Sequence, residues 1–348
     1  MKWNIPTRDG RYKAAALARQ ARLTKPAGAL GVLKDVAVWL ADIQQSDQPI
    51  ADTAAAIVFA SDHPVSRMGV SAYPREVTPM MVINLATGGA AASVLARMNG
   101  IPLHVVDVGT EAYPDPQPGP GIHWTRVGPA GVVGDLVTSD ATDKRALQAA
   151  LKAGADAVDA LPAGTRIAIF GEMGIGNTTP ASAISARLMQ TAAAEVVGPG
   201  TGVQGEALEA KCAVIQKALD RTLGTDEPLA VLRRLGGREI AAIVGAMGRA
   251  AERGMAILVD GFIVSSAALV AARHDPQIRD HMWFAHRSGE PGHARILASL
   301  GASPLIDAGM RLGEGSGALA SLPLIQASVA LHNQMATFEE ASVPDKAE

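Results

Sequence analysis

The stretch RIAIFGEMGIGNTTPASAI, residues Arg166–Ile184, decides the fold class of this chain. It begins with a short apolar run and passes through a turn that holds an acid, spaced glycines, an amide and two hydroxyls. It then continues into an alanine-rich segment typical of a helix. Because the apolar residues are continuous rather than alternating, they indicate a strand covered on both faces, as in a parallel sheet. The stretch therefore predicts a buried strand, a polar turn and a helix in series.

The same pattern recurs along the chain. Four more apolar runs end in polar residues or glycine and precede helical stretches: AAIVFA (55–60), PLHVVDV (102–108), MAILV (255–259) and MWFAH (282–286). This alternation predicts an α/β fold with a Rossmann-like open parallel sheet flanked by helices. An eight-stranded barrel is less favoured, since AGVVGDLV (130–137) is only a doubtful sixth strand. The glycine- and proline-rich segment 110–142 is expected to be an extended loop.

The composition limits the classes of function. Of 348 residues, 48% are hydrophobic but only 3% aromatic, which favours alanine-rich helices packed closely on a Val/Ile sheet. The net charge is −3 and no long basic tract occurs, so neither nucleic acid nor an anionic membrane is expected as a partner. The single cysteine, Cys212, excludes an internal disulfide framework and a multi-cysteine metal site, and it favours a cytoplasmic location. The N-terminus has no apolar core typical of a signal peptide.

One segment, MAILVDGFIVSSAALVAA (255–272), is about long enough to suggest a membrane span. It carries Asp260-Gly261 near its middle, and an aspartate buried in a bilayer costs about 2.5–3.5 kcal/mol. The segment therefore predicts a buried strand, an Asp-Gly turn and a buried helix, with no membrane.

Ligands of open α/β sheets bind at the carboxyl ends of the strands, where these polar clusters fall. In GEMGIGNTTP, Gly174 and Gly176 permit tight turns, and exposed N–H groups near Asn177 and Thr178 suit a phosphate. Thr179-Pro180 predicts a helix N-cap followed by proline. The stretch has neither the P-loop ending nor the G-x-G-x-x-G spacing. The glycine spacing alone therefore fits an ordinary strand–helix turn as well as it fits a phosphate site.

Three more groups of residues are candidates for a site. Glu314 lies between glycines in RLGEGSGALAS, where local burial can tune its protonation, although such an acid is more often solvated. Ser71 and Tyr73 lie on a loop before a helix start at Thr78-Pro79, and Met80 can line an apolar pocket or belong to the core. The histidines of HRSGEPGH lack persuasive metal spacing, so no metal is expected.

Taken together, these stretches resemble the nicotinate-nucleotide–dimethylbenzimidazole phosphoribosyltransferase family. The matching pieces follow the family's order over nearly the whole chain: LTKPAGALG, SDHPVS, GVSAYPREVT, GEMGIGNTTPASA, GPGTGVQGEAL, LVDGFIVSSAAL, HRSGEPGH and LGEGSGALAS. GEMGIGNTT and LGEGSGA are the most specific.

The resemblance implies a fold and a reaction. It implies a large α/β catalytic domain, residues 51–330, a small helical domain from residues 1–50 plus 331–348, and a homodimer. The implied reaction transfers phosphoribosyl from nicotinate mononucleotide to 5,6-dimethylbenzimidazole, giving α-ribazole 5′-phosphate, nicotinate and a proton. No metal or organic cofactor is needed, because the pyridinium leaves as a neutral ring and one base suffices.

The resemblance also implies residue roles. Glu314 is the expected catalytic base, and Glu172 is a second acid and the alternative base. Ser71, Tyr73 and the helix start at Met80 match the benzimidazole pocket. The loop with Gly174, Gly176, Asn177 and Thr178 matches the nucleotide site, and Asp260, Gly261 and Ser288 match segments that hold ribose and phosphate.

Some differences from the family and some rival functions remain. Arg75 stands where glutamine is common, Pro64 follows the Asp-His pair in place of glycine, and the acidic pair after Gly-Thr-Gly is missing. The Arg75 difference bears on acceptor preference. The rivals are a Rossmann-type cofactor-dependent oxidoreductase or methyltransferase, and a non-catalytic protein that binds α-ribazole or an azole.

Overall fold

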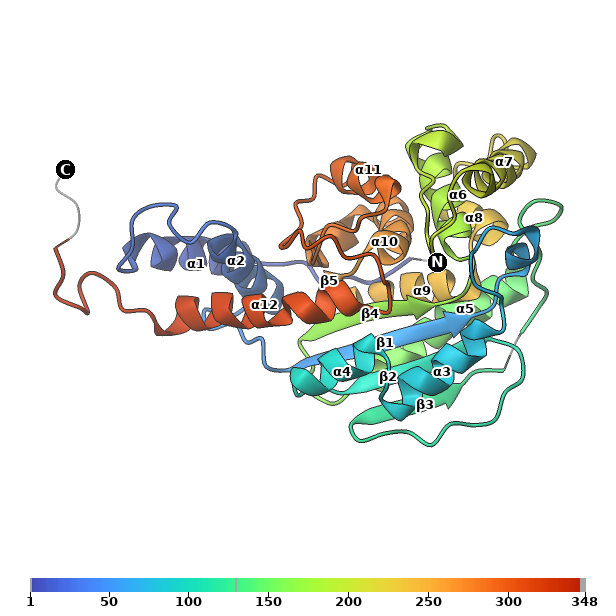
Figure 1. Cartoon of the computed structure of the whole chain (residues 1–348). Coiled ribbons are helices and arrows are strands. Elements are labelled where there is room, and N and C mark those ends of the chain that lie inside the picture. Colours follow the sequence, from blue (N-terminus) through green and yellow to red (C-terminus); the bar gives the residue numbers. More distant parts are fainter. Residues whose placement is uncertain (1, 129, 345–348) are drawn as a thin grey trace.

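The computed structural model describes residues 2–128 and 130–344. Its centre is a six-stranded sheet of order β3-β2-β1-β4-β5-β6, in which every neighbouring pair is parallel (Figure 1). The strands are β1 (Ala54–Ser61), β2 (Leu103–Gly109), β3 (Ile122–Arg126), β4 (Ile167–Met173), β5 (Ala256–Val259) and β6 (Met282–Phe284). This is the doubly wound order of Rossmann-type sheets, with its switch point between β1 and β4. The predicted fold class is confirmed.

The five expected strands are β1, β2, β4, β5 and β6. The doubtful stretch 130–137 forms no strand where the structure describes it, and Val133 makes only an isolated antiparallel bridge to Thr142. The expectation of a loop over 110–142 is wrong at β3. That strand, IHWTR, lies at the sheet edge with every residue at least partly exposed, so it lacks the apolar run that marks the others.

Helices cover both faces of the sheet, which is why its strands are continuously apolar. On β1, Ile57 and Phe59 face one core together with residues of α5 and α9, while Val58 faces another with residues of α2, α4 and α12. In Figure 1, α3, α4 and α12 lie in front of the sheet and α9 lies behind it. The first core involves α5 (Lys144–Asp159), α6 (Thr178–Met189), α7 (Glu206–Arg221), α8 (Pro228–Leu235), α9 (Arg238–Glu252), α10 (Phe262–His274) and α11 (Pro291–Ser299). The second involves α2 (Val32–Gln44), α3 (Val77–Thr87), α4 (Ala91–Met98) and α12 (Ser316–Gln334).

Helices α5 and α9 pack with their backbones in contact. A Cβ atom added at Gly154 would lie 1.8 Å from the carbonyl oxygen of Ala242, and one at Gly245 would lie 2.0 Å from that of Leu151. Only glycine fits at such approaches. The close packing expected from an alanine-rich, aromatic-poor sequence is present here.

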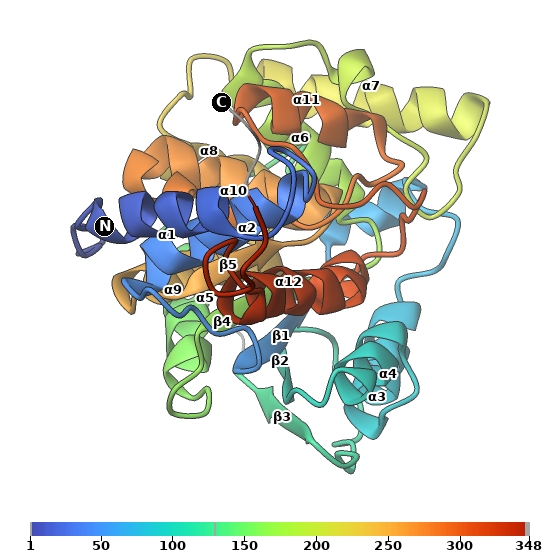
Figure 2. The same ribbon diagram turned by 90° about the vertical axis from the view of Figure 1, so that its left-hand side faces the viewer.

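The N-terminal helices lie beside the far end of α12 (Figure 2). Helix α1 (Arg11–Arg22) places Gln20 Nε2 3.0 Å from His332 Nδ1, and Arg19 Nε donates to the His332 carbonyl at 2.7 Å. Asn333 Nδ2 donates to the Pro49 carbonyl at 2.9 Å. Helix α12 crosses residue 330 without a break, and the division into 1–50 plus 331–348 and 51–330 stays a prediction. Three short 3₁₀ segments, η1 (Pro64–Met68), η2 (Ala193–Glu195) and η3 (Pro276–His281), complete the described elements.

The segment 255–272 forms β5, a turn and the buried helix α10, as predicted. A second stretch, Val77–Met98, is apolar and long enough to cross a membrane by length and composition. It is two helices, because α3 ends before Gly88, whose φ is +99°. An 11-residue helix such as α3 spans only about 16 Å, roughly half of a bilayer core.

Candidate active site

Buried carboxylates meet at the carboxyl ends of the central strands. Glu172 is the second-last residue of β4, Asp260 follows β5 and Glu314 precedes α12, and each is at most 5% exposed. The charges of Asp260 and Glu314 both act on Glu172, which places the three groups in one site. The structure thus brings together acids that are distant in the sequence.

The backbone at Glu314 is held in an unusual conformation. Gly313, Glu314 and Gly315 all have positive φ angles, of 89°, 63° and 82°. A non-glycine residue in this region is uncommon and marks a conformation imposed by its surroundings. Gly171 of β4 contributes to this, since a Cβ there would lie 2.2 Å from the Glu314 carbonyl oxygen. The flanking glycines are therefore required to aim the Glu314 side chain.

The Glu314 carboxylate lies at the N-terminus of α4. Its Oε2 accepts the Ala92 N–H at 3.0 Å, and the Ala91 N–H also lowers its pKa. A helix N-terminus favours a negative charge. A Cβ at Gly313 would lie 2.3 Å from Glu172 Oε1, so the second acid lies directly against the turn that carries Glu314.

Burial raises the pKa of both acids, and other groups modify each pKa differently. It raises the pKa of Glu172 to about 8, with further increases from the charges of Glu239, Asp260 and Glu314 and an opposing hydrogen bond from Asn177. Burial also raises the pKa of Glu314, and Asp260 adds to this, but the Ala92 and Ala91 N–H groups oppose it. Glu172 therefore holds its proton at neutral pH, and the N-terminus of α4 stabilises the negative charge at Glu314.

Asp260 and Gly261 support the start of α12. Asp260 Oδ1 accepts the Ala318 N–H at 2.9 Å and lies 3.5 Å from His286 Nε2. A Cβ at Gly261 would lie 3.1 Å from the same histidine nitrogen. Asp260 therefore holds the helix that begins just after Glu314, a contact that the sequence did not indicate.

The loop after β4 packs tightly on the end of β1. Gly176 has φ +92°, and a Cβ at Gly174 would lie 2.6 Å from the Ser61 carbonyl oxygen. Asn177 Nδ2 donates to Glu172 Oε2 in a short hydrogen bond. Helix α6 begins at Thr178 rather than at Pro180. The N-cap prediction at Thr179 is therefore wrong, because proline is tolerated throughout the first turn, where backbone N–H groups have no helical partner.

A buried lysine, for which the sequence gave no local motif, lies at the start of α6. Lys211 is 0% exposed, and its Nζ donates to Thr178 Oγ1 at 2.8 Å and to the Gly198 carbonyl at 2.9 Å. Burial lowers its pKa to about 8, and Glu290 opposes this change. An added Cβ at Gly200 would lie 2.7 Å from Thr178 Oγ1 and 3.0 Å from Lys211 Nζ. Lysine is rarely buried unless paired, so this cation at a helix N-terminus suits an anionic ligand.

Glu290 lies near this lysine, and Ser288 contacts Glu290. The Ser288 N–H donates to His293 Nδ1 at 2.8 Å, and Ser288 Oγ accepts the Glu290 N–H at 3.3 Å. Glu290 Oε1 accepts the Gly200 N–H at 2.9 Å, and burial raises the Glu290 pKa. Ser288 is therefore part of the frame that fixes Glu290.

The loop before α3 and the first turn of α3 expose apolar side chains. Tyr73 is 55% and Met80 is 64% exposed, so Met80 is not a core residue. Ser71 Oγ lies 2.8 Å from Thr201 Oγ1 and accepts the Tyr73 N–H at 3.2 Å. Arg75 Nη1 pairs with Glu111 Oε1 at 2.5 Å. Two exposed apolar side chains, one on this loop and one at the start of α3, suit a flat aromatic ligand.

A hydrogen bond connects the start of α3 to the loop after β4. The Ile175 N–H donates to Thr78 Oγ1 at 3.0 Å. Helix α3 begins at Val77, so Thr78-Pro79 lies within its first turn and is not the expected cap. The predicted acceptor and nucleotide segments are therefore neighbours.

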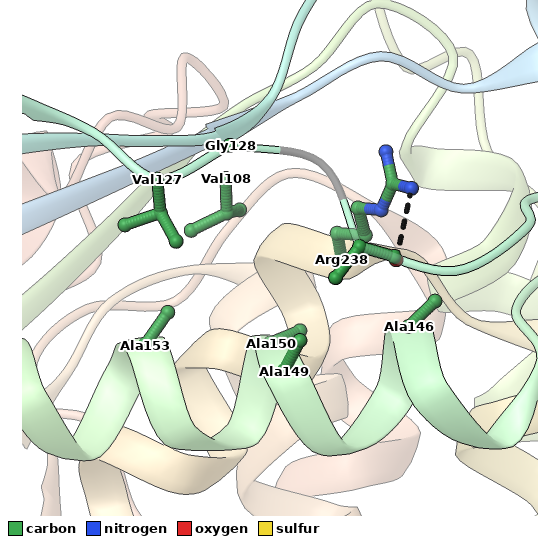
Figure 3. A pocket seen from close by; sticks show the side chains of 9 residues that line it. Val108, Val127, Gly128, Ala146, Ala149, Ala150, Ala153 and Arg238 are labelled. Atoms are coloured by element: carbon green, nitrogen blue, oxygen red, sulfur yellow. Dashed lines mark hydrogen bonds between the residues drawn. The ribbon is translucent and has the colours of Figure 1, made fainter.

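A separate cavity lies beneath the ends of β2 and β3 and is not a substrate site. Figure 3 shows it between Val108 and Val127 on one side and alanines of α5 on the other, with Arg238 at its end. Its volume of about 10 Å³ holds at most one water molecule. Arg238 Nη2 donates to the Ala130 carbonyl at 3.3 Å.

The acids and histidines of the site are not arranged as a metal centre. Within residues 2–128 and 130–344, no group of three or more His, Cys, Asp or Glu side chains is placed to hold a metal ion. The groups that the site does offer are side-chain acids, a buried ammonium and helix N-termini.

Comparisons with known proteins identify the family of this chain. A family model described as phosphoribosyltransferase matches residues 5–343. Nicotinate-nucleotide–dimethylbenzimidazole phosphoribosyltransferase of Azotobacter vinelandii is 48% identical over 99% of this chain and 98% of its own length, and that of Bradyrhizobium sp. (strain BTAi1) is 50% identical over 95% and 94%. The crystal structure of this enzyme from Thermus thermophilus superposes with a TM-score of 0.89 at 38% identity, covering 97% of this chain and 100% of that one. The chain belongs to the nicotinate-nucleotide–dimethylbenzimidazole phosphoribosyltransferase family.

Proposed function

We propose that this protein transfers the phosphoribosyl group of nicotinate mononucleotide to 5,6-dimethylbenzimidazole, in the branch of cobalamin biosynthesis that makes the lower-ligand nucleotide. The products are α-ribazole 5′-phosphate, nicotinate and a proton. The observation that supports this proposal most is Glu314, which is strained into a left-handed turn at the N-terminus of α4 beside the protonated Glu172. The rival cofactor-dependent oxidoreductase or methyltransferase has no support from the comparisons.

One base suffices for this reaction. The C1′–N bond to the cationic pyridinium breaks as a benzimidazole nitrogen forms a new bond to C1′, and nicotinate leaves with the electron pair, so its ring nitrogen needs no proton. The other benzimidazole nitrogen then carries an acidic N–H. Glu314 accepts this proton, a general-base contribution of about 10²–10⁴-fold. The fixed backbone at Glu314 keeps the carboxylate aimed before substrates bind.

Glu172 has a different role from Glu314. Because its pKa is about 8, it is protonated at neutral pH and is a poor base there. We assign to it a hydrogen-bonding role next to the reacting centre, fixed by Asn177. This assignment leaves Glu314 as the base.

Lys211 and the N-terminus of α6 form the proposed phosphate site. An ammonium group has three donors, and Lys211 uses two of them on Thr178 and Gly198. We propose that the third donor binds a phosphate oxygen. Gly174 and Gly176 let the backbone approach the donor nucleotide, and we propose that Asp260, Gly261 and Ser288 frame its ribose.

The acceptor is proposed to lie over Tyr73 and Met80, beside Ser71. These residues follow the carboxyl end of β1, and the Ile175–Thr78 hydrogen bond joins their segment to the loop after β4. Both observations support this arrangement. The ion pair of Arg75 with Glu111 draws that guanidinium toward the segment after β2, so we expect Arg75 to shape the pocket wall. The homodimer, the cytoplasmic location, the absence of nucleic-acid and membrane partners and the two-domain division stay predictions.

The test is chromatography of the products. Purified protein is incubated with nicotinate mononucleotide and 5,6-dimethylbenzimidazole, and free nicotinate and an α-linked nucleotide are quantified. We expect Glu314→Gln to lower kcat by about 10²–10⁴-fold with little change in substrate affinity. Glu209→Gln, an exposed glutamate on α7, is the matched control and should leave kcat unchanged.

Two outcomes would contradict the proposal. Unchanged turnover in Glu314→Gln would remove Glu314 as the base. Tight binding of both substrates by the unaltered protein without nicotinate release would instead favour the non-catalytic binding protein.

A further inference from the structure

One loop touches both halves of the proposed site. This bridging loop comprises residues 198–205, GPGTGVQG, between η2 and α7. On the phosphate side, its Gly198 carbonyl accepts from Lys211 at 2.9 Å, and Gly200 fits against Thr178 and Lys211 only because it lacks a Cβ. The loop is therefore part of the wall of the phosphate site.

On the acceptor side, the contact is made by one side chain. Thr201 Oγ1 lies 2.8 Å from Ser71 Oγ and accepts the Ala72 N–H at 3.1 Å. Ser71 Oγ in turn accepts the Tyr73 N–H at 3.2 Å. Thr201 is the residue next to Gly200, and its hydroxyl is thus hydrogen-bonded to the segment that carries Tyr73.

The bridging loop is rich in glycine and is held more firmly at one end than at the other. Gly200, Gly202 and Gly205 have φ angles of 54°, 121° and 55°, which glycine adopts without strain. Thr201 is exposed, so its hydrogen bonds to Ser71 and Ala72 compete with water. Arg311 Nη1 holds the Gly200 carbonyl at 3.1 Å and Glu290 holds its N–H, which ties the loop more firmly to the phosphate side.

We propose that Thr201 is a positioning residue that couples the two substrates: an anion at Lys211 fixes the bridging loop, and Thr201 then holds the Ser71–Tyr73 segment in place for the acceptor. This inference rests on the proposed function, because it needs the phosphate at Lys211 and the azole at Tyr73. A phosphate group tightens acceptor binding only if it binds better when the loop is in the position described here. The coupling must then be reciprocal, so the acceptor tightens phosphate binding by the same factor.

The experiment measures acceptor binding with and without an anion. Isothermal titration calorimetry gives the Kd of 5,6-dimethylbenzimidazole in the absence and presence of saturating inorganic phosphate. We expect phosphate to tighten binding by about three- to tenfold in the unaltered protein, the range that one net hydrogen bond supports. Thr201→Val keeps the shape but removes the hydroxyl, so the ratio should fall to near one. Thr201→Ser keeps the hydroxyl and should restore the ratio.

Turnover gives a second readout. Thr201→Val should raise the KM for 5,6-dimethylbenzimidazole by the same factor at saturating nicotinate mononucleotide, while kcat stays within about twofold. A merely structural role for Thr201 would change the melting temperature but not the ratio of the two Kd values.

The outcomes separate the coupling from the proposed function. If both ligands bind but phosphate leaves the acceptor Kd unchanged, or if Thr201→Val keeps the full ratio, the coupling is wrong and the proposed function stands. If neither ligand binds the unaltered protein, the proposed function is wrong and the coupling falls with it.

Discussion

A methyl group added at Gly171 should misplace the catalytic base without touching a substrate. In Gly171→Ala the new Cβ would lie 2.2 Å from the Glu314 carbonyl oxygen and 2.6 Å from the Gly315 nitrogen, where an ordinary contact is at least 3.4 Å. Relief of the overlap moves the turn by about 1.2 Å, since the neighbouring atoms are backbone and cannot rotate away. A displacement of about 1 Å in a reacting group costs about 10²-fold in rate, or roughly 2.7 kcal/mol.

The assay separates this displacement from unfolding. We expect kcat to fall by about 10²-fold, while the KM for nicotinate mononucleotide stays within a few-fold because Lys211 and Thr178 lie on other elements. The overlap should also lower the free energy of unfolding by about 1–3 kcal/mol, measured by urea denaturation. Gly10→Ala, where an added Cβ meets nothing within 4 Å, is the control. Full turnover in Gly171→Ala would refute the reasoning that the turn holds Glu314 in a fixed place.

The raised and lowered pKa values and the close backbone contacts lead to four other predictions. Because burial raises the pKa of Glu314, kcat should fall with decreasing pH at a value above the ordinary glutamate pKa of 4.5, and a profile flat to pH 4 would contradict its role. Glu172 keeps its proton in the folded state up to about pH 8 but loses it near pH 4.5 in the unfolded state. Between these two pH values the folded state binds more protons, so the free energy of unfolding falls as the pH rises from 4.5 to 8. Glu172→Gln should flatten this dependence in melting temperatures measured from pH 5 to 9. Lys211→Met should raise the KM for nicotinate mononucleotide by about tenfold or more, since a charge-assisted bond to phosphate is lost; an unchanged KM would remove Lys211 from the phosphate site. Gly245→Ala should lower the free energy of unfolding by about 1–3 kcal/mol, because its Cβ would lie 2.0 Å from the carbonyl oxygen of Leu151; an unchanged urea midpoint would contradict the backbone contact.

The parts of the fold that sequence predicts are those in which local pattern and burial agree. The runs that became β1, β4 and β5 are apolar because helices cover both of their faces. Strand β3 is at the sheet edge and keeps its polar residues exposed, so periodicity could not distinguish it from loop.

The site divides in the same way. Glu172 and Glu314 lie in glycine-rich turns whose chemistry is visible over a few residues. Lys211 reaches Thr178 across 33 residues of chain, so no local motif joins them. A signal did exist, since Lys211 is four residues before the buried Ile215 and seven before the buried Ala218, the spacing of the core face of a helix. A charged residue in that phase indicates a buried partner or ligand.

The difference between Glu172 and Glu314 is the feature of the site that the sequence could least predict. The sequence offered Glu172 as an alternative base. Its proximity to three other carboxylates, and the contact of Glu314 with the N-terminus of α4, distinguish the two acids. Protonation depends on distances between segments, which spacing along the chain does not contain.

Helix α12 has a mechanical consequence for the whole enzyme. Its first turn follows Glu314 and its last turn is fastened to α1 through His332, so a single rod of 19 residues, about 28 Å long, joins the proton acceptor to the opposite end of the molecule. A helix resists stretching, so a change at Gln20 acts on the same rigid element that begins just after Glu314. Pro323, within the helix, is where the rod is most able to bend, because proline removes one of its internal hydrogen bonds. Substitutions remote from both substrates, along this one line, should therefore alter the rate of the chemical step.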